Sequence, residues 1–142
     1  MGLHQLLYVS KPSNVYHKDI EAILSKSRTR NASVGISGAL IFTSDWFIQI
    51  IEGRSTAITN LYNRIAQDPR HVELELRLVR PIPERCFTNW GMDYVSQSQV
   101  SMAANRRFPV DMHFDPTDMS SETMIRFAAT VSGSNAGEPK GM

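Results

Sequence analysis

The stretch that decides the fold of this chain is Gly35-Ile-Ser-Gly-Ala-Leu-Ile-Phe-Thr-Ser-Asp-Trp-Phe-Ile-Gln-Ile-Ile-Glu-Gly53. Residues 35–43 and 46–52 are mostly apolar, and the polar triplet Thr43-Ser-Asp45 separates them. Two apolar runs joined by a short polar turn predict a β-hairpin. The second run is almost wholly apolar, so we expect it to form a strand in the core of a sheet.

One amide interrupts the second strand. Side chains alternate between the two faces of a strand, so Gln49 shares its face with Phe47 and Ile51. A buried amide costs about 1–3 kcal/mol for each group left without a hydrogen bond, so we expect Gln49 to have a partner. Tyr8, in the apolar run 6–9, is a second buried polar group and also needs a partner. Either Tyr8 and Gln49 satisfy each other, or a bound heterocycle completes the set.

Size and charge restrict the class of protein. The 142 residues suffice for one domain with a real core. The formal net charge is +1 and the basic residues are scattered, which argues against direct nucleic-acid binding. The lone Cys86 excludes an internal disulfide and a multi-cysteine metal site, and we assign no metal ligand. The chain has no apolar run of about 18 residues and no secretory leader at its start, so we expect no membrane span and a cytoplasmic location.

Hydrophobic periodicity predicts further strands and helices around the hairpin. The expected elements are a strand at residues 3–10, a helix from about 14 to 28, a second helix from 55 or 56 to about 68, a half-solvated strand at 72–78, and a short fifth strand at 90–95 with Trp90, Met92 and Tyr94 on one face. This order predicts an α+β, ferredoxin-like sandwich (βαββαβ plus a fifth strand), with two helices on one face of a mostly antiparallel sheet.

The residues after the fifth strand are expected to cover the other sheet face. Residues 101–107 and about 119–131 have helical patterns, and the second segment carries an apolar side made of Met124, Ile125, Phe127, Ala128 and Val131. We therefore divide the chain into a core domain at residues 1–98, a C-terminal helical extension at 99–132 and a disordered tail at 133–142. The helix around Phe127 is expected to be exposed and to dock a partner.

Several short motifs of the chain occur together in a set order. They are Tyr8 with Ser10, Arg30-Asn31, Gly35-x-Ser-Gly-Ala-Leu40, Phe47-Ile-Gln-Ile-Ile-Glu-Gly53, Gln67-Asp-Pro-Arg-His71 and Trp90-x-Met92. Each motif alone is a weak signal. Their ordered combination, from about residue 3 to 97, resembles the BLUF domain, a flavin-binding sensor of blue light. The chain departs from this family at Val9, where many relatives carry Arg.

The resemblance implies that a flavin is bound non-covalently between the two helices: FAD in this family, with FMN as an alternative. The cofactor-binding residues that it implies are Ile23, Arg30, Asn31, Gln49, Ile65, Asp68, Arg70 and His71. Ile23 and Ile65 match the apolar clamp on the ring. Asn31, just past the first helix, would bind the polar edge of the ring. The last three residues of the set match positions that hold the ribityl and phosphate end.

The resemblance also implies a photochemical role. Light would drive an electron and a proton from Tyr8 through Gln49 and back, after which the Gln49 amide is rotated or tautomerised. The signal is then a rearranged hydrogen-bond network, read out through Met92 and Trp90 of the fifth strand. No substrate turns over, so the protein is not expected to be an enzyme. The implied partner is a downstream effector such as a cyclic-dinucleotide phosphodiesterase or a transcription regulator, and we expect a homo-oligomeric, stand-alone sensor.

Other functions stay open, because a ferredoxin-like sandwich does not determine function. The chain can also be read as a small-ligand-binding module or a cofactor-independent enzyme without photochemistry. An enzyme would need a nucleophile with a base, and Asp45 and His71 are the only nearby candidates. Taken singly, Tyr8 and Met92 are compatible with core packing, and Asn31 with a helix C-cap. The colour of the purified protein discriminates, because a flavin photoreceptor is yellow.

Overall fold

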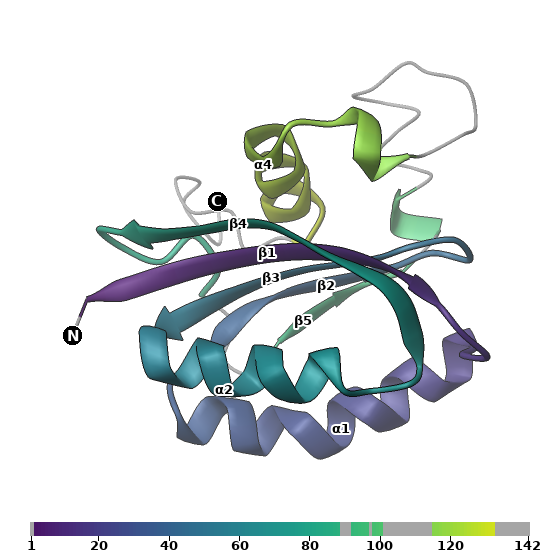
Figure 1. Ribbon diagram of the computed structural model, residues 1–142, viewed down its shortest axis with the longest axis horizontal. Coiled ribbons are helices and arrows are strands. Elements are labelled where there is room, and N and C mark those ends of the chain that lie inside the picture. Colours follow the sequence, from purple (N-terminus) through teal and green to yellow (C-terminus); the bar gives the residue numbers. More distant parts are fainter. Residues whose placement is uncertain (1, 89–91, 97, 101–114, 133–142) are drawn as a thin grey trace, which may run out of the picture.

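The computed structural model describes residues 2–88, 92–96, 98–100 and 115–132. Its elements, in chain order, are β1 (Leu3–Pro12), α1 (His17–Ser33), β2 (Ser37–Phe42), β3 (Phe47–Arg54), α2 (Ser55–Ala66), β4 (His71–Ile82), β5 (Asp93–Val95), the short 3₁₀ helix η1 (Pro116–Asp118) and α4 (Ser121–Ser132). Figure 1 shows one sheet with helices on both of its faces.

The sheet confirms the predicted α+β, ferredoxin-like class. Its five strands lie in the order β4-β1-β3-β2-β5. The first four pair antiparallel, whereas β5 runs parallel to β2. Strand β3 lies between β1 and β2, and β1 lies between β3 and β4, so each helix connects two parallel strands across an intervening one. Such crossovers are right-handed, which places α1 and α2 on the same face of the sheet.

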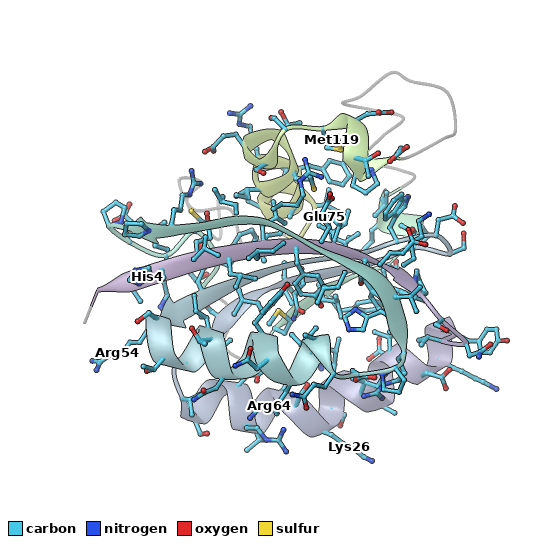
Figure 2. The ribbon with its side chains drawn as sticks, viewed as in Figure 1. His4, Lys26, Arg54, Arg64, Glu75 and Met119 are labelled. Carbon is cyan, nitrogen blue, oxygen red and sulfur yellow. The ribbon has the colours of Figure 1, made fainter. Side chains whose placement is uncertain are left out.

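Alternation along the strands gives the sheet two apolar faces, which we call the helix-side face and the reverse face. Leu6 and Tyr8 of β1 pack toward α1 and α2, whereas Leu7 and Val9 pack on the opposite side. Side chains fill both the space under the helices and the space under α4 (Figure 2). Within the described residues, no helix has both the length and the apolar character required to cross a membrane.

Helix α4 covers the reverse face, as the sequence predicts. Its buried residues are Met124, Ile125, Phe127 and Ala128. Phe127 is 3% exposed, so the prediction of an exposed docking site around it is wrong. The reason is that the reverse face of a sheet buried on both sides needs its own apolar cover. The predicted helix at 101–107 and the tail at 133–142 lie outside the described residues.

Helix α1 begins and ends later than the sequence pattern indicates. Asn14 has a φ of 56°, so the chain is still turning there. The Tyr16 N–H donates to Asp19 Oδ2 at 2.9 Å, and the helix begins at His17. Gly35, with a φ of 74°, stops the helix after Ser33, because this backbone conformation favours glycine. Asn31 is therefore a buried residue of the last helical turn and does not lie past the helix.

Strand β4 does not show the simple alternation predicted for residues 72–78. Leu74 packs with the helix-side core and Leu78 with the reverse-side core, although residues four apart share a face in a regular strand. The β1–β4 register shifts between Leu7 and Tyr8 and between Val9 and Lys11. Each shift adds a residue to β4, and such bulges exchange the two faces. As a result, Leu76 is half-exposed.

Candidate functional site

A cavity of about 300 Å³ opens between α1, α2 and the helix-side face of the sheet. Its lining residues are Tyr8, Ile20, Ile23, Leu24, Ser27, Arg30, Asn31, Leu40, Phe47, Gln49, Leu61, Arg64, Ile65, Asp68, Arg70 and His71. Aliphatic side chains of the two helices form its walls, whereas strands β1 and β3 supply the phenol and the amide. The cavity therefore suits a flat, mostly apolar ring with polar edges.

Tyr8 and Gln49 meet at this cavity. They face each other directly in the antiparallel pairing of β1 and β3. The Tyr8 hydroxyl donates to Gln49 Oε1 at 2.5 Å, and Gln49 Nε2 donates to Met92 Sδ at 3.4 Å. The partner that the buried amide requires is thus supplied by the protein. Both ends of the amide are engaged, so any reorientation of Gln49 must change its hydrogen bonds to Tyr8 and Met92.

Burial strengthens the preference of Tyr8 for its protonated form. Removal of the phenol from water raises the pKa of Tyr8 far above its ordinary value of 10.0, and nearby Tyr62 and Asp68 raise it further. The phenol is therefore protonated at neutral pH and remains a hydrogen-bond donor. The Tyr62 ring packs edge-on against it, with ring centroids 6.0 Å apart.

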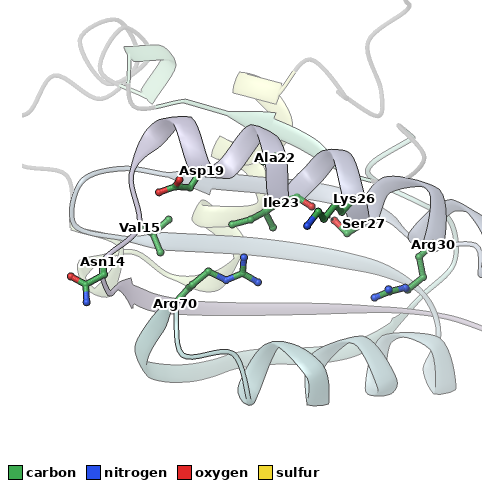
Figure 3. Close-up of a pocket in the computed structure, with 9 residues that line it drawn as sticks. All are labelled: Asn14, Val15, Asp19, Ala22, Ile23, Lys26, Ser27, Arg30 and Arg70. Atoms are coloured by element: carbon green, nitrogen blue, oxygen red, sulfur yellow. Dashed lines mark hydrogen bonds between the residues drawn. The ribbon is translucent and has the colours of Figure 1, made fainter.

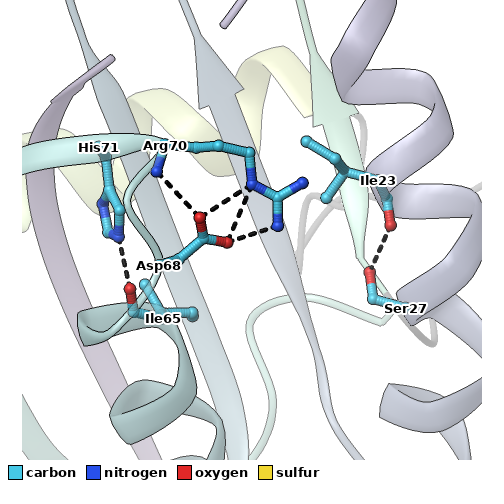
Figure 4. Close-up of polar contacts among 6 residues, drawn as sticks. All are labelled: Ile23, Ser27, Ile65, Asp68, Arg70 and His71. Carbon is cyan, nitrogen blue, oxygen red and sulfur yellow. Dashed lines mark hydrogen bonds and ion pairs between the residues drawn. The ribbon is translucent and has the colours of Figure 1, made fainter. Parts of the chain in front are cut away.

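Asp68, Arg70 and His71 lie at the end of the cavity where α2 leads into β4 (Figure 4). Arg70 Nε donates to Asp68 Oδ1 at 2.9 Å, and Arg70 Nη2 donates to Oδ2 at 2.5 Å. This pairing holds the pKa of Asp68 below its ordinary value. His71 contacts Ser10 Oγ through Nδ1 at 2.8 Å and the Ile65 carbonyl through Nε2 at 2.5 Å. A carbonyl only accepts, so Nε2 carries the proton and His71 joins β1, α2 and β4.

A wider groove of about 610 Å³ continues the cavity outward along α1. The two spaces share Ile23, Ser27, Arg30 and Arg70. Figure 3 shows Arg30 and Arg70 reaching toward the same space from α1 and from the residue before β4. Lys26 adds a third basic side chain to this groove. Guanidinium and ammonium groups at such a mouth suit a phosphate-bearing extension of the ligand.

The structure brings most of the predicted site residues together. The eight residues proposed to bind the cofactor all line the inner cavity, and Tyr8 lines it with them. Met92 lies next to Gln49, as expected, because its sulfur accepts from the amide. Trp90 lies outside the described residues. The positions of these residues do not test their individual roles in flavin binding and switching, which stay predictions.

Sequence reasoning overlooked the polar groups on the reverse face. Gln5 and Glu52 are both fully buried there and hydrogen-bonded to each other at 2.7 Å. The available signal was Glu52 itself, a charged residue within an apolar core strand. Sequence reasoning also overlooked Arg28, whose Nε donates to the Met92 carbonyl oxygen at 3.4 Å.

The geometry agrees with a known family of sensors. The profile of the BLUF family, "Sensors of blue-light using FAD", matches residues 3–93. The chain belongs to the BLUF family. Its matched segment is thus a sensor domain rather than an enzyme, and FAD is the cofactor. The resemblance inferred from the motifs is confirmed.

Three relatives of this BLUF chain illustrate the range of the family. It is 32% identical over 101 residues to photoactivated adenylate cyclase subunit beta of Euglena longa, which covers 70% of this chain and 12% of that protein. It is 34% identical over 76 residues to the blue light- and temperature-regulated antirepressor BluF of Escherichia coli (strain K12), which covers 54% of this chain and 19% of that protein. The BLUF protein BlrB in its dark state has a TM-score of 0.75 and 30% identity, covering 93% of this chain and 97% of that one. This chain thus spans only a small share of the length of the adenylate cyclase subunit and of the antirepressor.

The BLUF cofactor fits the residues found here. The walls contributed by Ile23 and Ile65 suit the faces of an isoalloxazine ring, and the Gln49 amide suits its polar edge, which carries both donors and acceptors. The basic outer groove, with Lys26 and Arg30, suits the diphosphate. FAD spans both chemistries, so its two halves match the inner cavity and the outer groove.

Proposed function

We propose that this chain is a blue-light photoreceptor in which the Tyr8–Gln49 pair is the light-operated switch. The observation that carries the proposal is the 2.5 Å hydrogen bond from the Tyr8 hydroxyl to Gln49 Oε1, at the edge of the flavin cavity. A tyrosine is one of the few side chains that can give up an electron, and here its hydroxyl is already aimed at an acceptor. When bound, FAD supplies the light absorption and a strongly oxidising excited state.

The chain's own residues then determine what moves. Loss of an electron makes a phenol strongly acidic, so the Tyr8 proton passes along its existing hydrogen bond to Gln49 Oε1. The amide is suited to this relay because it accepts at oxygen and donates at nitrogen. When the electron and the proton return to Tyr8, rotation or tautomerisation of Gln49 exchanges its donor and acceptor ends. After rotation, Tyr8 and Met92 face the opposite ends of the amide; after tautomerisation, they face the same atoms, but oxygen has become the donor and nitrogen the acceptor.

The changed amide alters the contact to Met92. Met92 immediately precedes β5, and β5 pairs with β2 along the sheet edge. In support of an output role, α4 packs on the reverse face, where its buried residues contact the same core as Val95 of β5. We assign the sensor to residues 1–98 and the output to the helical extension at 99–132. The effector is a separate or linked protein, and the cyclase and antirepressor relatives illustrate such outputs.

Absorption spectroscopy of the purified, FAD-loaded protein tests this function. We expect a structured flavin band that shifts slightly to the red under blue light and returns in darkness. Tyr8→Phe and Gln49→Leu should each retain FAD and lose the shift, because each removes one end of the 2.5 Å hydrogen bond. Tyr62→Phe is the matched control, because its ring contacts Tyr8 but does not line the cavity. A normal light-induced shift in either relay variant would contradict the assignment of that residue.

A further inference from the structure

A row of polar side chains crosses the reverse face of the sheet, where the flavin site does not reach. Gln5 on β1 and Glu52 on β3 are each 0% exposed. Gln5 Nε2 donates to Glu52 Oε2 at 2.7 Å. The other carboxylate oxygen, Glu52 Oε1, accepts from the backbone N–H groups of Cys86 and Phe87, each at 2.9 Å. A buried carboxylate is thus fully provided with donors inside an otherwise apolar core.

The row continues onto α4. Arg80 Nε of β4 donates to Gln5 Oε1 at 3.0 Å. The same guanidinium forms an ion pair with Glu122, in the first turn of α4. We call Glu52, Gln5, Arg80 and Glu122 the reverse-face row. It joins β3, β1, β4 and α4 through side chains alone, and Figure 1 shows these three strands side by side beneath α4.

The reverse-face row shares a strand pair with the photoactive residues. In the β1–β3 ladder, Tyr8 pairs with Gln49 and Gln5 pairs with Glu52. Gln5 also pairs with Arg80 in the β1–β4 ladder. The two pairs are separated by three positions along each strand, so alternation places them on opposite faces of the same ladder. Tyr8–Gln49 faces the flavin cavity, and Gln5–Glu52 faces α4.

Such an arrangement makes the row sensitive to small shifts of β1 against β3. Buried hydrogen bonds are strong when well aligned, and a buried donor or acceptor that loses its partner is costly. Gln49 and Glu52 lie on the same strand, so β3 is the direct route by which a change at Gln49 would reach Glu52.

We propose that the reverse-face row couples the Tyr8–Gln49 switch to α4, holding α4 on the sheet in darkness and loosening it under blue light. The inference rests on the proposed function, because it requires that Gln49 rearranges. Glu52, Gln5 and Arg80 are positioning residues in this scheme, since none of them lines the flavin cavity. Their role is to make the position of α4 depend on the alignment of β1 with β3.

Amide hydrogen exchange of residues 124–128, in the dark and under blue light, tests the coupling in the FAD-loaded full chain. In the wild-type protein, illumination should speed exchange of these amides by about two- to tenfold, the range expected for losing one hydrogen bond that holds the helix. Glu122→Gln removes the charge from the α4 end of the row at an exposed position, so the variant should fold. Its dark exchange should rise to the illuminated wild-type rate, and the difference between light and dark should disappear.

Glu73→Gln is the matched control. It makes the same chemical change on β4, the strand that carries Arg80, and weakens an ion pair to β1 (Lys11 Nζ at 3.7 Å), but that pair does not reach α4. This variant should keep the wild-type difference. A light-dark difference that persists in Glu122→Gln, whatever its dark rate, would show that the row only stabilises the fold and would overturn the inference. Loss of the difference in Glu73→Gln would also overturn it, because the effect would then belong to any surface charge.

Absorption spectra of the same samples separate this inference from the proposed function. A normal red shift with unchanged exchange at residues 124–128 in the wild-type protein would overturn the coupling and leave the photoreceptor intact. A wild-type protein with bound FAD and no red shift would overturn the proposed function and the coupling with it.

Discussion

Gln49 and Glu52 are separated by three positions on β3 but serve the two faces of the sheet differently. Gln49 has its oxygen on Tyr8 and its nitrogen on Met92, so both ends can be exchanged without exposing a charge. The two oxygens of the Glu52 carboxylate can only accept hydrogen bonds, and Gln5, Cys86 and Phe87 all donate to them. An amide can therefore act as a switch where a carboxylate provides a fixed anchor.

The buried carboxylate predicts a pH dependence of stability. Burial raises the pKa of Glu52 above its ordinary value of 4.5, despite the hydrogen bonds from Phe87, Gln5 and Cys86 that lower it. The folded state thus binds this proton more tightly than the unfolded state. The contribution of Glu52 to the free energy of unfolding is therefore fully present below the ordinary pKa and is lost as pH rises through the raised folded pKa.

Glu52→Gln should remove this part of the pH dependence, because the variant has no titrating group at the site. Denaturant unfolding between acidic and neutral pH measures this dependence. Glu73→Gln, at a side chain that is 69% exposed, should keep the wild-type dependence. Identical pH profiles for Glu52→Gln and the wild-type protein would contradict the assignment.

At the scale of elements, the close approach of β2 to β3 depends on a glycine. A Cβ at Gly38 would lie 2.0 Å from the Ile50 carbonyl oxygen and 3.2 Å from Met92 Sδ. Backbone cannot yield as a flexible side chain does, so β2 would have to separate from β3 and Met92 would move. The hairpin predicted from the sequence thus also positions the sulfur that faces Gln49.

Gly38→Ala should lower the free energy of unfolding by about 3 kcal/mol, the upper end for overpacking a core. It should also change the flavin absorption spectrum of the folded fraction of the variant, because Met92 is displaced from Gln49. Thermal unfolding and absorption spectra check the two effects. Gly2→Ala is the control, because nothing lies within 4 Å of its added Cβ. Equal melting temperatures for the two variants would contradict the close approach.

At the scale of the whole molecule, the proposed function places photochemistry on one face of the sheet and output on the other. The helix-side face holds the cavity, and the reverse face is covered by α4. Phe127 contributes to that cover and is buried in the reverse-side core. Truncation of this ring should therefore affect stability and leave the flavin site unchanged.

Phe127→Ala should lower the free energy of unfolding by about 3–5 kcal/mol, the usual cost of removing a buried aromatic ring. The red shift under blue light should persist, because Phe127 does not line the flavin cavity. Chemical denaturation and light-dark difference spectra measure these outcomes. Arg126→Ala, at an exposed position of the same helix, should be nearly neutral. A loss of the red shift in Phe127→Ala alone would show that α4 supports the photochemistry itself.

Much of this molecule was predictable from local pattern. The apolar runs around Thr43–Asp45 predicted the hairpin, and alternation put Gln49 on the face shared with Phe47 and Ile51, which is the face found. The order of motifs identified the family and its cofactor. The apolar side of residues 119–131 predicted a cover for the second face. Each of these conclusions depends on periodicity or spacing within a short segment, which the sequence displays directly.

Other features depended on tertiary structure, because they arise between segments far apart in the chain. Asn31 became a residue of the last helical turn because Gly35, and not the helical pattern, ends α1. The bulges of β4 follow from its register against β1, which no alternation within β4 reveals. The same register joins Gln5 to Glu52 and Arg80, residues 47 and 75 positions away. The sequence by itself therefore determined the order of the elements, the family and the candidate Tyr8–Gln49 pair, whereas only the tertiary structure decided which polar groups meet on the reverse face.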